Sequence, residues 1–366
     1  MKKQVILVLT FSLYVFMTSL AFSGPIKLSL DLEIKEPENI IFYGLGDIAT
    51  DSKNNIYVLD KKEKFVYLFN EEGKFLKKIG RSGQGPGEFV EPCSIYIDAK
   101  DIIYILDERN RRVEIFDSNA SYIKSIKIIN FPSGSGHHII VDKSGNFYIS
   151  GYYRFQNSLM AKFSSTGELL KHFSLPVIEY KGIEFDDHSQ IMVNQLLCGG
   201  SMCFDDEERL FFSYKWPHQI KILTPEGKAL FQSSKESKLN WTPPFFKTDQ
   251  INGMLFGVFT LTSKLFFLDN YLVNFIHAID WEGNPRKKIQ MSVFENNPEE
   301  YIRYKRKYTV LEFFTKEGEF ITSTEIDEKI SFKASDKKGR ILALKRDDED
   351  MQSIVRYRIE INRNDS

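Results

Sequence analysis

The 366-residue sequence has few of the features by which most functional classes are recognised. Its 49 basic and 50 acidic residues leave a net charge of -1, so composition gives no electrostatic case for binding nucleic acid. The densest basic run, residues 303–307, is short and follows two glutamates, which is more typical of a solvated helix face. No G-x-S-x-G motif presents a serine nucleophile.

Long apolar runs are also scarce, and the clearest one lies at the N-terminus. Two lysines precede an apolar stretch from Val5 to Leu20, and Ala21-Phe22-Ser23 follows with small residues where a signal peptidase cleaves. The stretch is shorter than the ~20 apolar residues of a spanning helix. We therefore predict a signal peptide at residues 1–23. With no cysteine nearby for lipid attachment, we expect a periplasmic or secreted protein with no membrane span after cleavage.

The three cysteines are too few and too widely spaced for a zinc ribbon. Cys198 and Cys203 flank a short flexible tether, and an exported protein can keep a disulfide, so this pair is a candidate bond. Cys93 lies beside an expected inner strand and is most simply a small buried apolar residue.

A repeat of 47 residues dominates the rest of the chain. This spacing separates Asp51 from Asp98, Asp60 from Asp107, and Phe69 from Phe116. Each copy holds four short runs of strand-forming residues divided by turn residues. A long repeat of four strands predicts an all-β protein, a six-bladed β-propeller of four-stranded antiparallel blades in one domain over residues 24–366.

Two features of the repeats concern how the ring is completed. The alternating segment Ile26–Ile34 is expected to supply the missing outer strand of the last blade and so to close the ring. A hairpin over residues 309–326 has no pair of inner strands of its own. It could belong to a seventh blade, although we favour six blades. A recurring aspartate is expected to stabilise the turn after the first strand. It is found at Asp51, Asp98, Asp142 and Asp336.

Two segments carry a family resemblance. Gly80-Arg81-Ser82-Gly83-Gln84-Gly85-Pro86-Gly87-Glu88-Phe89, with Pro92 after it, resembles the junction between NHL repeats, and Asp107 to Asp117 resembles the second half of that repeat. The chain is thus similar to exported six-bladed propellers of the NHL and TolB-like type. The resemblance implies the fold strongly and the function weakly, because that family includes binding scaffolds, lyases and hydrolases.

The positions of the histidines indicate whether a metal site is expected. Enzymes of this architecture often hold a metal on the axis, and here only His137 and His138 start an inner strand. Adjacent residues point to opposite sides, so at most one of them faces the axis. A catalytic zinc typically needs three protein ligands. The sequence therefore predicts no metal site and no cofactor, with these two histidines as weak candidates.

Topology selects the binding face. The connections between second and third strands lie on the same side as the crossings between blades, and they carry arginines and aromatic residues, which are enriched in interfaces. We expect a binding or scaffold protein that recognises a protein partner or small ligand there. The alternatives are a hydrolase or lyase with a site at the channel mouth, with or without a metal, and a structural member of a cell-envelope assembly. The candidate binding residues are Arg109, Arg111, Tyr152, Tyr153, Arg154, Trp216 and His218.

Overall fold

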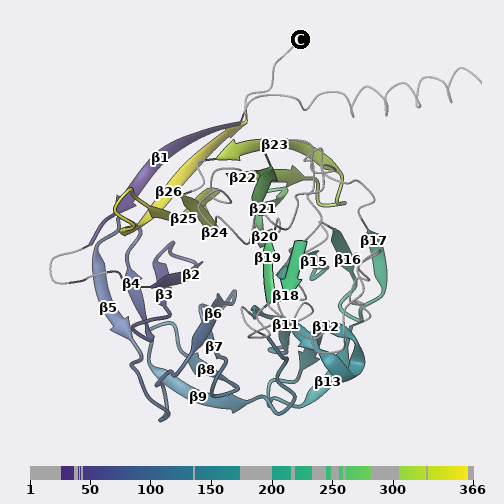
Figure 1. The fold of residues 1–366 in the computed structure, drawn as a ribbon. Coiled ribbons are helices and arrows are strands. Elements are labelled where there is room, and N and C mark those ends of the chain that lie inside the picture. Colours follow the sequence, from purple (N-terminus) through teal and green to yellow (C-terminus); the bar gives the residue numbers. More distant parts are fainter. Residues whose placement is uncertain are drawn as a thin grey trace, which may run out of the picture.

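The described part of the chain forms a ring of six antiparallel sheets around one axis (Figure 1). The computed structural model describes residues 26–36, 40, 42, 44–134, 137–173, 200–215, 219–232, 245–248, 255–258, 261–281, 305–326 and 329–361. Each sheet has four strands, which confirms the predicted six-bladed β-propeller. The one helical element in these ranges is the 3-10 turn η1 (Arg154–Gln156). None of their helices has the length and apolar character needed to cross a membrane.

The first three blades follow the chain, each beginning with its innermost strand. Blade one is β2 (Leu45–Thr50), β3 (Ile56–Asp60), β4 (Phe65–Phe69) and β5 (Phe75–Ile79). Blade two is β6 (Pro92–Ile97), β7 (Ile103–Asp107), β8 (Arg112–Phe116) and β9 (Tyr122–Lys127). Blade three is β10 (Ile139–Val141), β11 (Phe147–Tyr153), β12 (Ser158–Phe163) and β13 (Leu169–His172).

The next blades keep this order. Blade four is β14 (Gly200–Phe204), β15 (Leu210–Tyr214), β16 (Ile220–Leu223) and β17 (Ala229–Gln232). Blade five is β20 (Leu261–Leu268), β21 (Tyr271–Trp281), β22 (Lys305–Phe314) and β23 (Phe320–Ile326). The hairpin over residues 309–326 is therefore the outer half of blade five. A separate two-stranded sheet is formed by β18 (Phe245–Thr248) and β19 (Leu255–Val258).

Blade six joins the two ends of the described chain. It contains β24 (Ile330–Ser335), β25 (Arg340–Arg346) and β26 (Gln352–Ile361), and β1 (Ile26–Ile34) pairs with β26 as its outermost strand. The ladder runs from Ile26 opposite Ile361 to Ile34 opposite Ile354. The two strands lie side by side in purple and yellow in Figure 1. Closure by the N-terminal strand is confirmed, and it covers the edge that β26 would otherwise expose.

Apolar clusters between neighbouring blades make up the core. In β3, Val58 packs in the cluster shared with blade six, whereas Leu59 packs in the cluster shared with blade two. Comparable clusters join each of the other pairs of neighbouring blades. Because the second strand is covered on both faces, it reads as a continuous apolar run without the alternation of a half-exposed strand. β3 and β7 are accordingly buried throughout.

The recurring aspartates stabilise turns, as expected. Asp51 Oδ1 accepts hydrogen bonds from the backbone N–H groups of Lys53 (2.9 Å) and Asn55 (2.8 Å). Asp98, Asp142 and Asp336 accept the same pair of bonds, from the residues two and four positions later. The recurrence of these carboxylates at one position of the repeat is thus explained by local structure rather than by catalysis.

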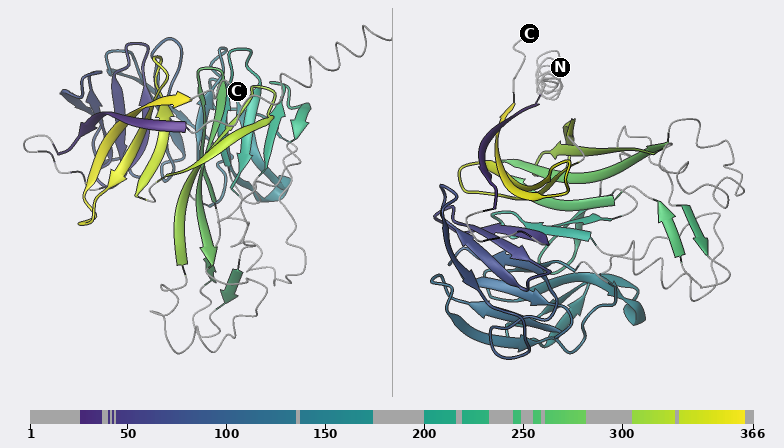
Figure 2. Two further views of the ribbon diagram at one scale, coloured as in Figure 1. Left: turned by 90° about the horizontal axis from the view of Figure 1, so that it is seen from above. Right: turned by 60° about the vertical axis from the view of Figure 1, so that its left-hand side comes forward.

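Two further views show how blade five departs from the others. Its middle strands are long, 11 residues in β21 and 10 in β22, and the green pair projects beyond the disc in Figure 2. The ladder continues to Trp281 opposite Lys305. The helix expected over residues 303–307 is therefore wrong at Lys305–Lys307, which belong to β22, because pairing with β21 decides the local conformation.

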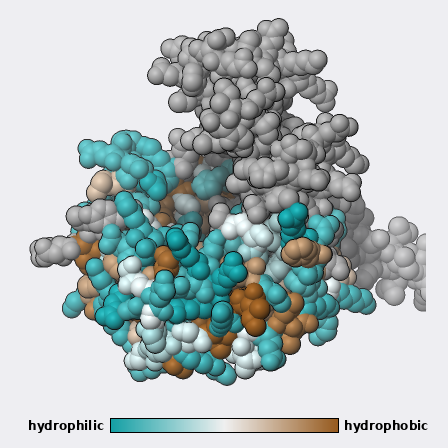
Figure 3. Space-filling model, turned by 60° about the horizontal axis from the view of Figure 1, so that its bottom comes forward, coloured by the Kyte–Doolittle hydropathy of each residue, from teal (hydrophilic) through white to brown (hydrophobic). Residues whose placement is uncertain are grey.

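The described surface is mainly hydrophilic, with small separate apolar areas in the view of Figure 3. Most of its exposed apolar side chains are single residues on outermost strands, such as Leu76, Ile123 and Leu170. Isolated apolar residues of this kind are ordinary on a soluble surface.

Candidate functional site

The expected binding face is the side of the disc where inner strands begin and second strands end. Arg109 and Arg111 are exposed in the β7–β8 connection, and Arg154 is exposed in η1. Phe155, the next residue, is 94% exposed and was not among the expected binding residues. These side chains are available to a partner, as expected.

The neighbouring tyrosines are not available, which corrects the expectation of an exposed aromatic loop. Tyr152 and Tyr153 belong to β11 and are 6% and 4% exposed. They pack in different clusters, Tyr152 toward blade four and Tyr153 toward blade two, and the Tyr153 hydroxyl donates to the Ile149 carbonyl at 3.2 Å. Strand β11 continues through Tyr153, so both rings belong to the core. Trp216 and His218 lie outside the described residues.

An ion pair crosses the centre of the ring on this same face. Lys264 of β20 reaches from blade five to blade one, where its Nζ lies 2.7 Å from Asp47 Oδ1. The Asp47 side chain is 5% exposed. Its Oδ2 also accepts from the Ser94 hydroxyl at 3.2 Å and the Ile95 N–H at 3.3 Å, both in blade two. Residues remote in sequence are therefore tied together at the axis.

Other basic side chains surround this pair. His138, Lys264 and Lys333 all interact electrostatically with Asp47, and we call these four residues the axial group. Lys61 and Lys215 act on it from the β3–β4 and β15–β16 connections. The Lys61 chain lies over blade one, since a Cβ placed on Gly46 would be 2.3 Å from Lys61 Cε. Lysines outnumber carboxylates in this constellation, so its local field is positive.

The pKa values in the axial group follow from burial and from this charge. Burial alone would raise the pKa of Asp47, but the Lys264 charge and hydrogen bond, with His138 and Lys333, outweigh it and lower that pKa. Burial lowers the pKa of Lys333 to about 8, although Asp47 opposes the change. Burial, then repulsion from Lys264, lowers the pKa of His138 well below its ordinary value. A charged carboxylate thus lies close to Lys333, a lysine whose pKa is lowered by burial.

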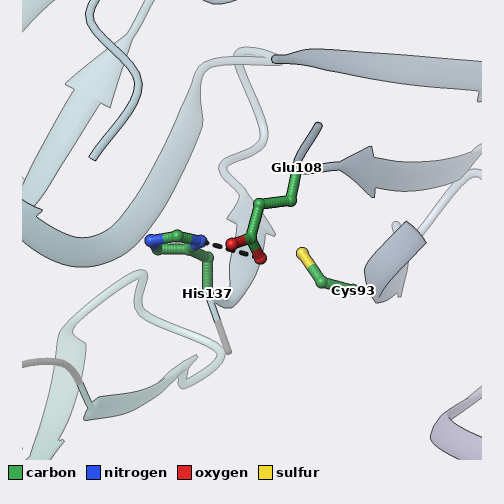
Figure 4. Close-up of side chains that lie close together, drawn as sticks. All are labelled: Cys93, Glu108 and His137. Atoms are coloured by element: carbon green, nitrogen blue, oxygen red, sulfur yellow. Dashed lines mark ion pairs between the residues drawn. The ribbon is translucent and has the colours of Figure 1, made fainter. Parts of the chain in front are cut away.

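The adjacent histidine faces away from the axis, as the strand geometry predicted for one of the two. His137 is 2% exposed and its Nδ1 lies 3.1 Å from Glu108 Oε2. Figure 4 shows the Glu108 carboxylate between the His137 ring and the Cys93 sulfur. Cys93 is buried, as expected, in the cluster between blades two and three. The three residues form a second constellation beside the axial group.

The candidate disulfide is contradicted at Cys203, which is a free cysteine in β14. Its side chain packs against the apolar cluster between blades four and five, and this packing holds the sulfur within the blade interface. Cys198 lies outside the described residues.

Comparisons with known proteins agree with the architecture. A family model, DUF5128, described as 6-bladed beta-propeller, matches residues 36–188. A structure from Bacteroides fragilis NCTC 9343, named as an exported protein, aligns with a TM-score of 0.57 and 14% identity, over 92% of this chain and 95% of its own. A DUF4221 family member from Bacteroides vulgatus ATCC 8482 aligns with a TM-score of 0.57 and 12% identity, over 93% of this chain and 99% of its own.

Another structure found in the comparison is that of an enzyme. A streptogramin B lyase aligns with a TM-score of 0.47 and 12% identity, over 92% of this chain and 98% of its own. No curated protein matches the sequence. At these identities the likeness shows the fold alone. The chain is a β-propeller.

Sequence reasoning missed the axial group and the contact between Glu108 and His137. One signal was available, because Lys264 and Lys333 are charged residues in inner strands that are otherwise uncharged. Another is that Asp47 and Ser94 are 47 residues apart, at the same position of the repeat. No spacing groups Glu108 with His137, because blades two and three bring them together only through packing.

Proposed function

We propose that the protein is an exported binding protein, of the NHL and TolB-like type, that holds a small anionic ligand over the axial group. One observation carries this proposal: lysines from blades one, four, five and six act on a site where Asp47 is the buried carboxylate. Asp47 is matched by Lys264 at 2.7 Å. The charge of Lys333, together with Lys61, then favours a carboxylate or phosphate from outside.

The surrounding face suits the same role. Arg109, Arg111 and Arg154 are exposed on the side where the axial group lies, and arginine binds carboxylate and phosphate through paired hydrogen bonds. Export to the periplasm or medium is proposed from the N-terminal segment that resembles a signal peptide. A protein partner could place an acidic side chain over the axial group and contact the same arginines over a larger area.

The test measures binding of inorganic phosphate and citrate by calorimetry at low salt. Lys333→Met should weaken binding about ten- to a hundredfold, because a charge-assisted hydrogen bond contributes about 1.5–3 kcal/mol. Lys53→Met is the matched control, since Lys53 is exposed in the β2–β3 turn on the opposite face. Equal affinity in the two variants, or binding of neither anion by the unmodified protein, would refute the proposal.

A second candidate function, hydrolysis or elimination, is favoured by Lys333 itself. Its pKa of about 8 is near the value at which a general base works best at neutral pH. A screen of nitrophenyl esters and lactones separates this function from binding. Turnover that Lys333→Met abolishes and Lys53→Met retains would support it, whereas equal turnover by the two variants would remove Lys333 from any mechanism.

A further inference from the structure

Three metal-ligating side chains meet between blades two and three, beside the axial group but away from the axis. One ligand atom each from Cys93, Glu108 and His137 lies within 4.8 Å of the other two. The residues come from the start of β6, the residue after β7, and the segment before β10. Cys93 is the extra residue of a bulge, since Pro92 pairs with Asp107 and Ser94 with Leu106. The bulge lets Ser94 contact Asp47 while Cys93 packs between the blades.

The hydrogen bonds of His137 indicate which ring nitrogen is free to bind a cation. Nε2 lies 3.3 Å from the Ser133 carbonyl oxygen. A carbonyl oxygen only accepts, so Nε2 carries the hydrogen and donates it. In the neutral ring, Nδ1 then carries a lone pair, and the Glu108 carboxylate oxygen lies 3.1 Å from it. Two acceptors at this distance repel each other unless a positive ion lies with them.

The surroundings of Nδ1 do not supply that ion. Nδ1 is buried without a hydrogen-bond partner, so Glu108 Oε2 lies off the direction in which the ring nitrogen would donate. A protonated ring would be expected to align its N–H with the carboxylate, because charge-assisted hydrogen bonds are short and straight. The misalignment favours a cation held by several ligands over a simple ion pair.

The donor set indicates the class of cation. We propose that Cys93 Sγ, Glu108 and His137 Nδ1 bind a divalent ion of the zinc type, with a fourth position open on the solvent side. Mixed sulfur, nitrogen and oxygen ligands suit Zn²⁺, and three protein ligands leave one place for water or a ligand. The Glu108 side chain is 16% exposed, which gives the ion a route in. Binding converts the Cys93 thiol to a thiolate and releases its proton to solvent.

Outer contacts hold the ligands in place. The Ser133 carbonyl orients the ring in the way that metal-bound histidines are usually oriented. Gly151 of β11 leaves room for the ring, since a Cβ there would lie 2.4 Å from His137 Cδ2. Phe131 packs edge-on against the same ring, with centroids 5.1 Å apart. The imidazole is therefore fixed before any ion arrives.

The test is a titration of the purified mature chain, stripped with a chelator, with Co²⁺ as a spectroscopic probe and then with Zn²⁺. We expect one equivalent of Co²⁺ to produce thiolate-to-cobalt charge-transfer absorption, Zn²⁺ to displace it, and one proton to be released. Cys93→Ser should abolish the absorption, whereas Cys203→Ser, at the other described cysteine, should retain it. Glu108→Gln should weaken Zn²⁺ binding at least about tenfold, since even outer contacts have effects of that size.

Three outcomes overturn the proposal: no stoichiometric binding of either ion, absorption that survives in Cys93→Ser, or unchanged Zn²⁺ affinity in Glu108→Gln. If Cys93→Ser fails to fold, Glu108→Gln still tests the proposal, because Glu108 is only partly buried and glutamine has nearly the same shape as glutamate. Lys333 is not a ligand here, so anion binding over the axial group can fail while metal binding succeeds.

Discussion

Replacing Lys333 by methionine should stabilise the protein at neutral pH. Its pKa falls from 10.5 in the unfolded chain to about 8 in the folded protein, chiefly through burial. Each unit of pKa corresponds to about 1.4 kcal/mol, so keeping this lysine charged costs the fold roughly 3 kcal/mol. Methionine has a similar chain without the charge. Lys333→Met should therefore raise the free energy of unfolding by up to about 3 kcal/mol below pH 8.

The pH dependence distinguishes this cause from a change in packing. Below about pH 8 both states are protonated and the full penalty applies. As pH rises from about 8 toward 10.5, the folded state loses its proton first, and the penalty fades. The advantage of Lys333→Met over the unmodified protein should shrink across the same interval. A difference that packing produces would not change with pH.

Urea unfolding at about pH 7 and about pH 10, followed by circular dichroism, measures both free energies. The unmodified protein and Lys333→Met carry the same other titrating groups, so their difference isolates this lysine. Lys53→Met, exposed on the opposite face, should show a small difference that is the same at each pH. A destabilised Lys333→Met at about pH 7, or an advantage that persists at about pH 10, would refute the reasoning.

Three further results are expected. Removing residues 24–35 exposes β26 and leaves Arg356 without its 2.7 Å contact to Asp31, so the free energy of unfolding should fall by about 5 kcal/mol or more. A truncated chain with the same melting temperature as the mature protein would contradict closure. Lys264→Met strands the buried Asp47 charge and should cost about 3–5 kcal/mol, much of it restored when Asp47→Asn is added; unfolding of the single and double variants in urea measures the recovery. Anion binding should weaken as pH rises through about 8, where Lys333 loses its charge; calorimetric titrations across that range would show a constant affinity if Lys333 took no part.

The fold was predictable because the repeat encodes it locally. Each copy carries its own strands and turns, and the turn aspartates accept the same backbone hydrogen bonds wherever the position recurs. The alternation in Ile26–Ile34 was equally informative, since an outermost strand has one solvent face. These features depend on near neighbours in sequence, and sequence patterns report such neighbours well.

The site was predictable only in part, because its residues are joined through the ring. Lys264 and Asp47 are 217 positions apart and meet only when blade five lies across from blade one. The arginines are exposed in the connections where topology placed them. The tyrosines were misplaced because second strands are covered on both sides, so an aromatic pair at the end of β11 is buried whichever way each ring points.

The charges at the axis are difficult to explain as structure alone. Turn aspartates, interblade clusters and the closing strand account for the stability of the ring, and none of them requires Lys333. A half-buried lysine whose pKa is held near 8 opposes folding at neutral pH. Groups kept at such a penalty are found mainly at functional sites. If an anion binds there, it restores the charged form of Lys333 and raises its pKa, so ligand binding and proton uptake are coupled. Proton uptake on phosphate binding near pH 8 that is absent in Lys333→Met would show that the cost of burying Lys333 is linked to ligand binding.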